Sequence, residues 1–292
     1  MYFHDKNEVI MIFEKNKIGL IGAGNMAEAI IGAIVQKLCK PDQISISDIR
    51  PERLSDLYQK YGIHSKTDNN QIFQENDIII IAVKPQQISE AFHFFKEQKP
   101  YPILKRKLII SIAAGIPIRA LENYVYPYIL PDKQSYIPIA RVMPNTPSLV
   151  QKGMSGVAFN QHINQNDQDL TLGILNAMGK VIQVSENELD AVTAISGSGP
   201  AYVFYFIESM IEGAIKIGFS QEIASQLTLE TFRGALALLE KEHDTAENLR
   251  KKVTSPGGTT EAAINHMELN NVRNIFIQAI QAALIRAGEL KQ

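Results

Sequence analysis

The feature that most constrains the fold of this chain is a glycine-rich segment between an expected strand and an expected helix. The apolar run Lys17–Ile21 is followed directly by Gly22-Ala23-Gly24-Asn25-Met26-Ala27, and residues 28–37 have a helical pattern. In a G-x-G-x-x-A segment the first glycine permits a tight turn, the second lets a pyrophosphate approach the backbone, and the small third residue lets helix and strand pack closely. This position predicts the first unit of a dinucleotide-binding domain, and a purely structural glycine turn is the alternative.

Apolar and helical segments alternate through the rest of the first half. The run Ile78–Ile81 is typical of a strand buried on both faces. Residues 124–138 contain three prolines and are expected to form an irregular connection. Further strands are expected at 44–48, 77–83, 107–113, 139–143 and 180–184, and helices at 51–61, 86–98 and 165–178. Such alternation predicts a doubly wound, mostly parallel sheet.

The second half has a different pattern. From Leu189 onward apolar residues recur at spacings of three, four and seven, which indicates a long helix that is either interrupted or tightly packed around Gly197, Gly199 and Pro200. Further helices are expected at 221–242, 259–269 and 271–289, and no strand after residue 185. We therefore predict an α/β Rossmann-type domain at 16–184, an all-α domain at 185–292 and a flexible extension at 1–15.

Composition excludes several classes of protein. A net charge of −2 gives no reason to expect binding to nucleic acid or to an anionic membrane. No window approaches the roughly 20 apolar residues of a membrane span, and charges interrupt the first 16 residues, unlike a secretory signal. The single cysteine, Cys39, cannot form an internal disulfide and suits a reducing compartment. We predict a cytoplasmic protein in which Cys39 is a buried or half-buried structural thiol and no metal is bound.

Three charged residues at the end of the second strand and just beyond it give opposing indications about the cofactor. Asp48 ends that strand, where an acid usually binds the ribose 2′-hydroxyl of NAD and repels the 2′-phosphate of NADP. Arg50 and Arg53 follow, and an arginine can bind a phosphate through two parallel hydrogen bonds. The direction of the Asp48 side chain decides between these interpretations.

Two more candidates follow strands at their carboxyl ends, where ligands bind in open α/β sheets. Lys84 precedes Pro85 and is expected to face the cofactor; the alternative is a solvated lysine before a helix that has Pro85 in its first turn. Asn145 lies between two prolines in a rigid loop suited to the side of the nicotinamide, and the alternative is a stiff connection.

The segment Ser255-Pro256-Gly257-Gly258-Thr259-Thr260-Glu261 indicates the substrate. Proline keeps Ser255 extended, the glycines permit a tight turn, and the residues from Glu261 begin a helix. A helix N-terminus with hydroxyls and free N–H groups attracts small anions, including a carboxylate. The sequence therefore predicts a small acidic substrate.

Taken together, these segments resemble the pyrroline-5-carboxylate reductase family from about Lys17 to the C-terminus. The glycine loop is shared by many dehydrogenases, whereas the last two motifs are specific in combination and their order matches the family. The motifs are Gly22–Ala27, Ala82-Val83-Lys84-Pro85-Gln86, Ser111–Gly115, Arg141–Pro147, Ser196–Tyr202 and Thr254–Thr260.

The resemblance implies hydride transfer from NADPH, with NADH possible, to the C=N carbon of 1-pyrroline-5-carboxylate, giving L-proline in the last step of proline biosynthesis. It implies that helical domains interleave in a homodimer, that dimers assemble into larger rings, and that the active site lies between the cofactor and the partner's helical domain. The cofactor-binding residues that it implies are Gly22, Ala23, Gly24, Asn25, Met26, Asp48, Arg50, Ala82, Val83, Lys84, Pro85, Ala113 and Asn145.

The resemblance also assigns the substrate side of the site. Thr260 is the candidate catalytic residue, near the ring nitrogen; because a threonine hydroxyl is a poor acid, we assign it hydrogen bonding and orientation. Aligning Glu242 requires one extra residue before Val253. The substrate-binding residues implied are Ser255, Gly257, Gly258, Thr259 and Glu242.

Two other functions fit part of the sequence. A β-hydroxyacid dehydrogenase has a similar plan but needs a lysine on the long helix of its second domain, and here none follows Ser196 until Lys216. A non-enzymatic nucleotide sensor would need the glycine loop but not the Ser255–Thr260 segment. Oxidation of NAD(P)H by the cyclic imine distinguishes the enzyme from the sensor.

Overall fold

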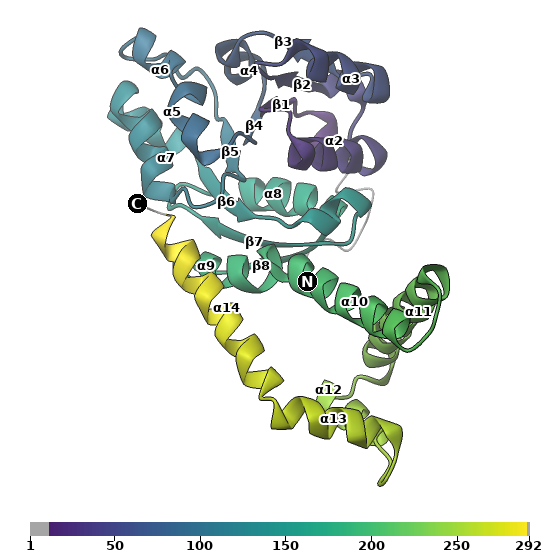
Figure 1. Cartoon of the computed structure of the whole chain (residues 1–292). Helices are drawn as coiled ribbons and strands as arrows, with labels where there is room; N and C mark the ends of the chain where they lie inside the picture. Colours follow the sequence, from purple (N-terminus) through teal and green to yellow (C-terminus); the bar gives the residue numbers. More distant parts are fainter. Residues whose placement is uncertain (1–11, 291–292) are drawn as a thin grey trace. The chain divides into compact units, whose positions relative to one another are not determined.

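The computed structural model describes residues 12–290, and within these residues the strands form one eight-stranded sheet (Figure 1). The strand order is β3-β2-β1-β4-β5-β6-β7-β8. The strands are β1 (Ile18–Ile21), β2 (Ile44–Ser47), β3 (His64–Lys66), β4 (Ile78–Ile81), β5 (Leu108–Ser111), β6 (Ile139–Met143), β7 (Gly153–Phe159) and β8 (Gly179–Gln183). Neighbours are parallel except for the antiparallel pair β6 and β7. The predicted mostly parallel, Rossmann-type sheet is therefore confirmed, and its first six strands have the usual dinucleotide-binding order.

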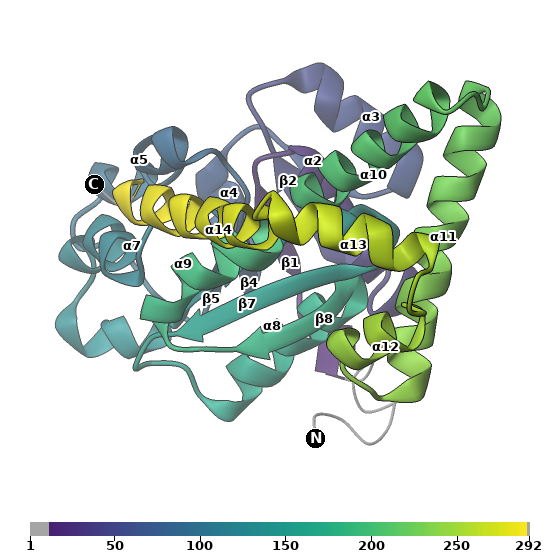
Figure 2. The same cartoon turned by 60° about the horizontal axis from the view of Figure 1, so that its bottom comes forward.

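Strand β7 was not predicted, and its direction follows from the connection before it. Only residues 144–152 separate β6 from β7, whereas a parallel return needs a crossover of a dozen or more residues. The strand then runs parallel to β8 (Figure 2). Its small residues, including Gly153 and Gly156, give no apolar alternation from which sequence could identify it.

Helices cover both faces of this sheet, and the isoleucine run shows how. Ile78 and Ile80 belong to the core that contains α2 and α8, whereas Ile79 and Ile81 belong to the core that contains α4 and α7. All four side chains have 0% exposure, so the prediction of a strand buried on both faces is confirmed. The helices are α2 (Asn25–Lys37), α3 (Pro51–Tyr61), α4 (Asn69–Glu75), α5 (Ile88–Ala91), α6 (Phe94–Glu97), α7 (Ile118–Val125) and α8 (Gln165–Met178).

The single helix expected at 86–98 is wrong, because this segment is a 3-10 turn followed by the short helices α5 and α6. Phe92, Phe94 and Phe95 are all buried. The rings of Phe94 and Phe95 pack against Phe73 with centroids 5.5 and 4.9 Å away. One continuous helix would spread three such closely spaced rings around its axis, so the backbone breaks between the two helices to bury them together.

The N-terminal prediction is wrong in part. Residues 1–11 lie outside the described residues, but residues 12–14 are helical and Phe13 is buried in the core with α2. The Gln43 amide holds this segment, since its Nε2 donates to the carbonyl oxygens of Phe13 (2.8 Å) and Asn16 (3.2 Å). A flexible extension at 1–15 therefore does not include residues 12–15.

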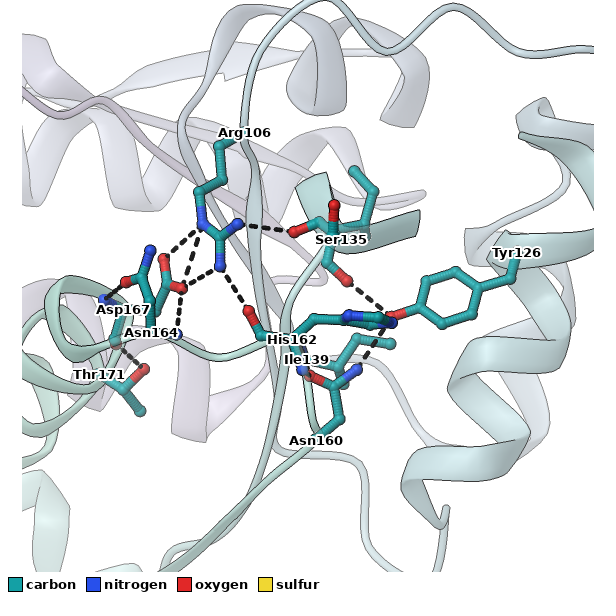
Figure 3. A network of polar contacts seen from close by, with 10 residues as sticks. Arg106, Tyr126, Ser135, Ile139, Asn160, His162, Asn164, Asp167 and Thr171 are labelled. Carbon is teal, nitrogen blue, oxygen red and sulfur yellow. Dashed lines mark hydrogen bonds and ion pairs between the residues drawn. The ribbon is translucent and has the colours of Figure 1, made fainter. Parts of the chain in front are cut away.

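A polar network holds the irregular connection expected at 124–138, which contains the end of α7 and two 3-10 turns. Arg106 donates to the carbonyl oxygens of Ser135 and His162 and pairs with Asp167 in the first turn of α8 (Figure 3). Tyr126 donates to the carbonyl oxygen of Ile137 at 2.8 Å. Arg106 precedes β5, so the network lies at the amino ends of the parallel strands, opposite the edge where ligands bind.

Within residues 12–290 the chain divides into two compact units, residues 12–197 with 284–290, and residues 198–283. The predicted interruption of the long helix is a π-helical turn, Thr193–Gly197, between α9 (Leu189–Val192) and α10 (Gly199–Lys216). The other helices are α11 (Gln221–Glu242), α12 (Ala246–Lys252), α13 (Thr259–Leu269) and α14 (Val272–Glu289). The domain boundary at residues 184 and 185 stays a prediction, placed at the end of the last strand. No helix in residues 12–290 is long and apolar enough to cross a membrane.

Candidate active site

The glycine loop joins β1 to α2 as predicted, and glycine is needed at its two glycine positions for different reasons. Gly22 has φ +100°, and a Cβ atom there would lie 2.7 Å from the carbonyl oxygen of Ala82. Gly24 is the N-cap of α2 in an extended conformation with no side-chain cap. A Cβ atom at Gly24 would meet no atom within 4 Å. The first glycine is thus required by the protein backbone, whereas the space beside the second is open to a ligand.

A cavity of about 830 Å³ lies at this loop, at the carboxyl ends of the strands. Of the predicted cofactor-binding residues, those that line it are Gly22, Ala23, Gly24, Asn25, Asp48, Arg50, Ala82, Val83 and Lys84. The predicted residues Met26, Pro85, Ala113 and Asn145 are not among its lining residues. The structure therefore brings the ends of β1, β2 and β4 together around one space.

Ala23 in the loop is held from both sides. Its N–H donates to Asp48 Oδ2 at 2.7 Å, and its carbonyl oxygen accepts a hydrogen bond of 2.9 Å from Arg53 Nε. Arg53 also pairs with Glu28, whose pKa is held below its ordinary value by hydrogen bonds from Lys60 and Arg53. These contacts fix the loop before any ligand is bound.

Asp48 is bonded to Arg50 as well as to the loop. Oδ1 accepts from the Arg50 backbone N–H and from Nε, both at 2.9 Å, and Oδ2 accepts from Nη2 at 3.1 Å. Burial alone would raise the pKa of the Asp48 carboxyl, but the hydrogen bonds from Arg50 and Ala23 outweigh it and hold the pKa below its ordinary value. Asp48 is therefore ionised and directed toward Arg50 and the loop.

Part of the cavity lining has no signal in the sequence. Asn69 at the start of α4 accepts a hydrogen bond of 2.7 Å from Ser47 Oγ, and its Nδ2 lies 3.4 Å from the carbonyl oxygen of Ala91. Ser47 and Ala91 also line the cavity, and the remaining unpredicted lining residues are Ile21, Ile49, Thr67, Asp68, Gln87, Glu90, His93, Phe94 and Glu97. Only the three-residue strand β3 precedes Thr67, so no strand pattern indicated that a ligand-binding edge lies there.

Asn145 is buried, and its side chain has protein partners. Nδ2 donates to the carbonyl oxygen of Ser196 in the π-helical turn at 3.0 Å, and Oδ1 accepts from the Met154 N–H at 2.9 Å. The predicted loop between two prolines is thus tied both to β7 and to the π-helical turn. Lys84, by contrast, is exposed at the cavity, as either interpretation of it requires.

The predicted anion site belongs to the second compact unit. Gly257 has φ +72°, the Gly258 N–H donates to the carbonyl oxygen of Ser255 at 3.0 Å, and α13 spans Thr259–Leu269, the range expected from the sequence. The Gly257 N–H donates to Glu261 Oε2 at 2.8 Å, so a carboxylate of the chain itself already lies on this turn.

The side chains predicted around this turn are accessible. Ser255 and Thr259 are exposed and Thr260 is half-buried, whereas Glu242 is exposed at the last position of α11. In the described part of the chain, no group of three or more His, Cys, Asp or Glu side chains is arranged to hold a metal ion.

The cavity fits a dinucleotide. Its volume is within the range of about 300–1,000 Å³ usual for small-molecule sites. The open space beside Gly24 and the uncapped N-terminus of α2 provide room and free N–H donors for a pyrophosphate. The N–H groups of Gly24 and Asn25 would hold the pyrophosphate, because those of Gly22 and Ala23 already donate to Ser47 and Asp48. Asp48 and Arg50 lie where the adenosine ribose binds in this fold.

Comparison with known proteins gives matches over nearly the whole chain. Residues 186–290 match the family model for pyrroline-5-carboxylate reductase dimerisation, and residues 17–115 match that for NADP oxidoreductase, coenzyme F420-dependent. Pyrroline-5-carboxylate reductase 2 of Bacillus subtilis is 37% identical over 278 residues, covering 94% of this chain and 95% of that protein. The Pseudomonas aeruginosa reductase is 37% identical over 279 residues, covering 94% and 97%.

Solved structures agree with these matches. A pyrroline-5-carboxylate reductase from Coxiella burnetii is 34% identical, with a TM-score of 0.84 over 96% of this chain and 100% of that one. A Plasmodium falciparum pyrroline carboxylate reductase with NADP bound is 28% identical, with a TM-score of 0.81 and coverage of 96% and 100%.

Proposed function

Because this chain belongs to the pyrroline-5-carboxylate reductase family, we infer that it reduces 1-pyrroline-5-carboxylate to L-proline with NAD(P)H, the last step of proline biosynthesis. The observation that carries this conclusion is the 37% identity to a named reductase over 278 residues, which include both the cofactor cavity and the helical second half. A nucleotide sensor has no need to share the Ser255–Thr260 segment with reductases.

In this reaction the chain positions the cofactor and the imine and polarises the C=N bond. When bound, the reduced nicotinamide supplies a hydride to the C=N carbon of the protonated cyclic imine. Holding donor and acceptor carbons about 3–3.5 Å apart can lower the barrier by about 7–11 kcal/mol. The glycine loop is already held in place at Ala23 by Asp48 and Arg53, and in this proposal it supports the cofactor's position.

We propose that the turn before α13 binds the substrate carboxylate through Ser255 and the Gly257 and Gly258 N–H groups. The support is chemical: the Gly257 N–H already donates to a carboxylate, that of Glu261, at 2.8 Å. Substrate binding would then replace this internal carboxylate with that of the pyrroline ring. Thr259 and Glu242 are proposed as further substrate contacts from the resemblance alone.

Thr260 is proposed to orient the ring nitrogen. Its hydroxyl lies in the first turn of α13, three residues after Gly257, so it stands beside the proposed carboxylate donors. A neutral hydroxyl can accept the N–H of the protonated imine without carrying charge itself. Orientation by this hydrogen bond would aim the C=N carbon while the carboxylate fixes the opposite side of the ring.

The chain forms a homo-oligomer through its helical region, which matches the dimerisation family model. We propose a homodimer and, following the resemblance, a ring of dimers in the cytoplasm. Large apolar side chains exposed in the single chain support a dimer; examples are Phe204 (64%), Leu236 (59%) and Ile275 (59%). The half-buried free thiol of Cys39 fits a reducing compartment. Light scattering on the purified protein measures the number of subunits.

The activity is tested by following nicotinamide absorbance with purified protein, NADPH or NADH, and 1-pyrroline-5-carboxylate. We expect oxidation of the cofactor that depends on the imine, and proline as the product. Cofactor binding without turnover would reject the reductase in favour of a nucleotide sensor. The matched control uses a β-hydroxyacid in place of the imine together with oxidised cofactor, and we expect no reduction of that cofactor.

A further inference from the structure

The Asp48 carboxylate has no acceptor position left for a ribose hydroxyl. An ionised carboxylate offers about four lone-pair positions. Oδ2 accepts from Ala23 N (2.7 Å) and Arg50 Nη2 (3.1 Å), and Oδ1 accepts from Arg50 N and Nε, both at 2.9 Å. Four donors therefore occupy the four positions, and the acid that usually selects NAD is engaged within the protein.

Arg50 is in the opposite situation. A guanidinium has five N–H donors, and Asp48 takes one from Nε and one from Nη2. Three N–H groups therefore remain for a ligand. The Arg50 side chain is 50% exposed and lines the cavity, whereas the Asp48 side chain is only 8% exposed. The pair thus presents its cation to the cavity and keeps its anion beneath.

The second arginine of this segment is not available in the same way. Arg53 donates through Nε to the carbonyl oxygen of Ala23 and pairs with Glu28 through Nη2, and it is not among the residues that line the cavity. The other charged lining residues are Asp68, Lys84, Glu90 and Glu97. Three of these four are acidic, and Lys84 lies on the separate loop after β4, so at the carboxyl end of β2 Arg50 is the cation in the lining.

We propose that Arg50, fixed by Asp48, selects NADPH over NADH by donating to the 2′-phosphate of the adenosine ribose. Asp48 holds the guanidinium and the glycine loop and does not bind the ribose. A fixed guanidinium matches the geometry of a phosphate with two parallel hydrogen bonds, and a dianionic phosphate gains more from that charge than a hydroxyl does. The inference rests on the proposed function only in that the cavity takes a nicotinamide dinucleotide.

The test measures binding of 2′,5′-ADP and 5′-ADP to the full chain by isothermal titration calorimetry. Neither nucleotide carries a nicotinamide, so the result does not depend on reductase activity, and a protein that fails to reduce the imine can still pass or fail this test. We expect 2′,5′-ADP to bind at least tenfold more tightly than 5′-ADP. In Arg50→Gln we expect this preference to disappear while 5′-ADP affinity changes less than twofold, which also shows that the variant is folded.

The matched control is Arg233→Gln, which removes the same charge from an exposed position on α11 and is expected to leave both affinities unchanged. The proposal is overturned if the unmodified protein binds 5′-ADP as tightly as 2′,5′-ADP. It is equally overturned if Arg50→Gln weakens both nucleotides alike or leaves the preference in place.

Discussion

Replacing Gly24 with alanine should separate cofactor binding from folding. Gly24 has φ −72° and ψ −179°, which alanine adopts without strain, and the added methyl group meets no protein atom within 4 Å. A glycine-to-alanine change at such a position stabilises a protein by about 0.4–1 kcal/mol, chiefly by restricting the unfolded chain. We therefore expect Gly24→Ala to fold with unchanged or slightly higher stability.

The same methyl group occupies space that the pyrophosphate needs. Overfilling a packed site costs about 1–3 kcal/mol, which corresponds to a roughly 5- to 150-fold increase in the Kd for NADPH. Fluorescence titration of NADPH measures this increase, and urea unfolding measures the free energy of unfolding on the same preparation.

Gly22→Ala is the matched control, and it should fail for the opposite reason. Its φ of +100° and the 2.7 Å approach to the Ala82 carbonyl oxygen disfavour any side chain, so we expect a loss of at least about 1–3 kcal/mol in unfolding free energy. If Gly24→Ala bound NADPH within twofold of the unmodified protein, the pyrophosphate would not lie beside Gly24 and the assignment of the cavity would be wrong.

Three further predictions concern separate parts of the chain. Thr260→Ala should lower kcat far more than it weakens NADPH binding, and steady-state kinetics with an unchanged kcat would remove Thr260 from the mechanism. Burial raises the pKa of the Cys39 thiol to about 12. Because the thiolate is the reactive form, native protein at pH 8 should react with iodoacetamide at least about 100-fold more slowly than unfolded protein. The folded pKa is the higher one, so the contribution of this thiol to the free energy of unfolding is lost as pH rises from about 8.5 toward 12. Arg106→Met should leave the 3%-exposed Asp167 carboxylate without its cation, costing about 3 kcal/mol in urea unfolding with no change in the Kd for NADPH; a change in that Kd would mean that the network is coupled to the cofactor site.

The sequence predicted the sheet well wherever burial leaves a continuous apolar run. Ile78–Ile81 is such a run, and all of its side chains are buried on one face or the other. It predicted poorly where small residues or closely spaced aromatics control the backbone. Strand β7 carries glycines in place of an apolar alternation, and the three buried phenylalanines after Pro85 split one expected helix into two.

The cofactor site shows a different limit. The types and spacing of Asp48 and Arg50 were visible in sequence, but their two indications opposed each other. What separates them is which atoms are already bonded, and the donor from Ala23 comes from another loop, 25 positions earlier in the chain. Hydrogen-bond saturation of a carboxylate is therefore a three-dimensional property, even when most of its donors belong to a neighbouring residue.

Helix α10 shows why periodicity predicts a helix more readily than it predicts what covers the helix. Tyr202 and Phe206 pack edge to face against Phe276 of α14, and their ring centroids lie 5.7 and 5.4 Å from that of Phe276, respectively. Phe204 and Tyr205, on the same helix, are 64% and 67% exposed. All four are aromatic, so composition cannot distinguish them, yet leaving two such rings in water forfeits about 1.5–3 kcal/mol for each large apolar side chain. We therefore expect Phe204 and Tyr205, and the part of Phe206 that stays 38% exposed, to be covered by another subunit, whereas Tyr202 is half-buried within the chain.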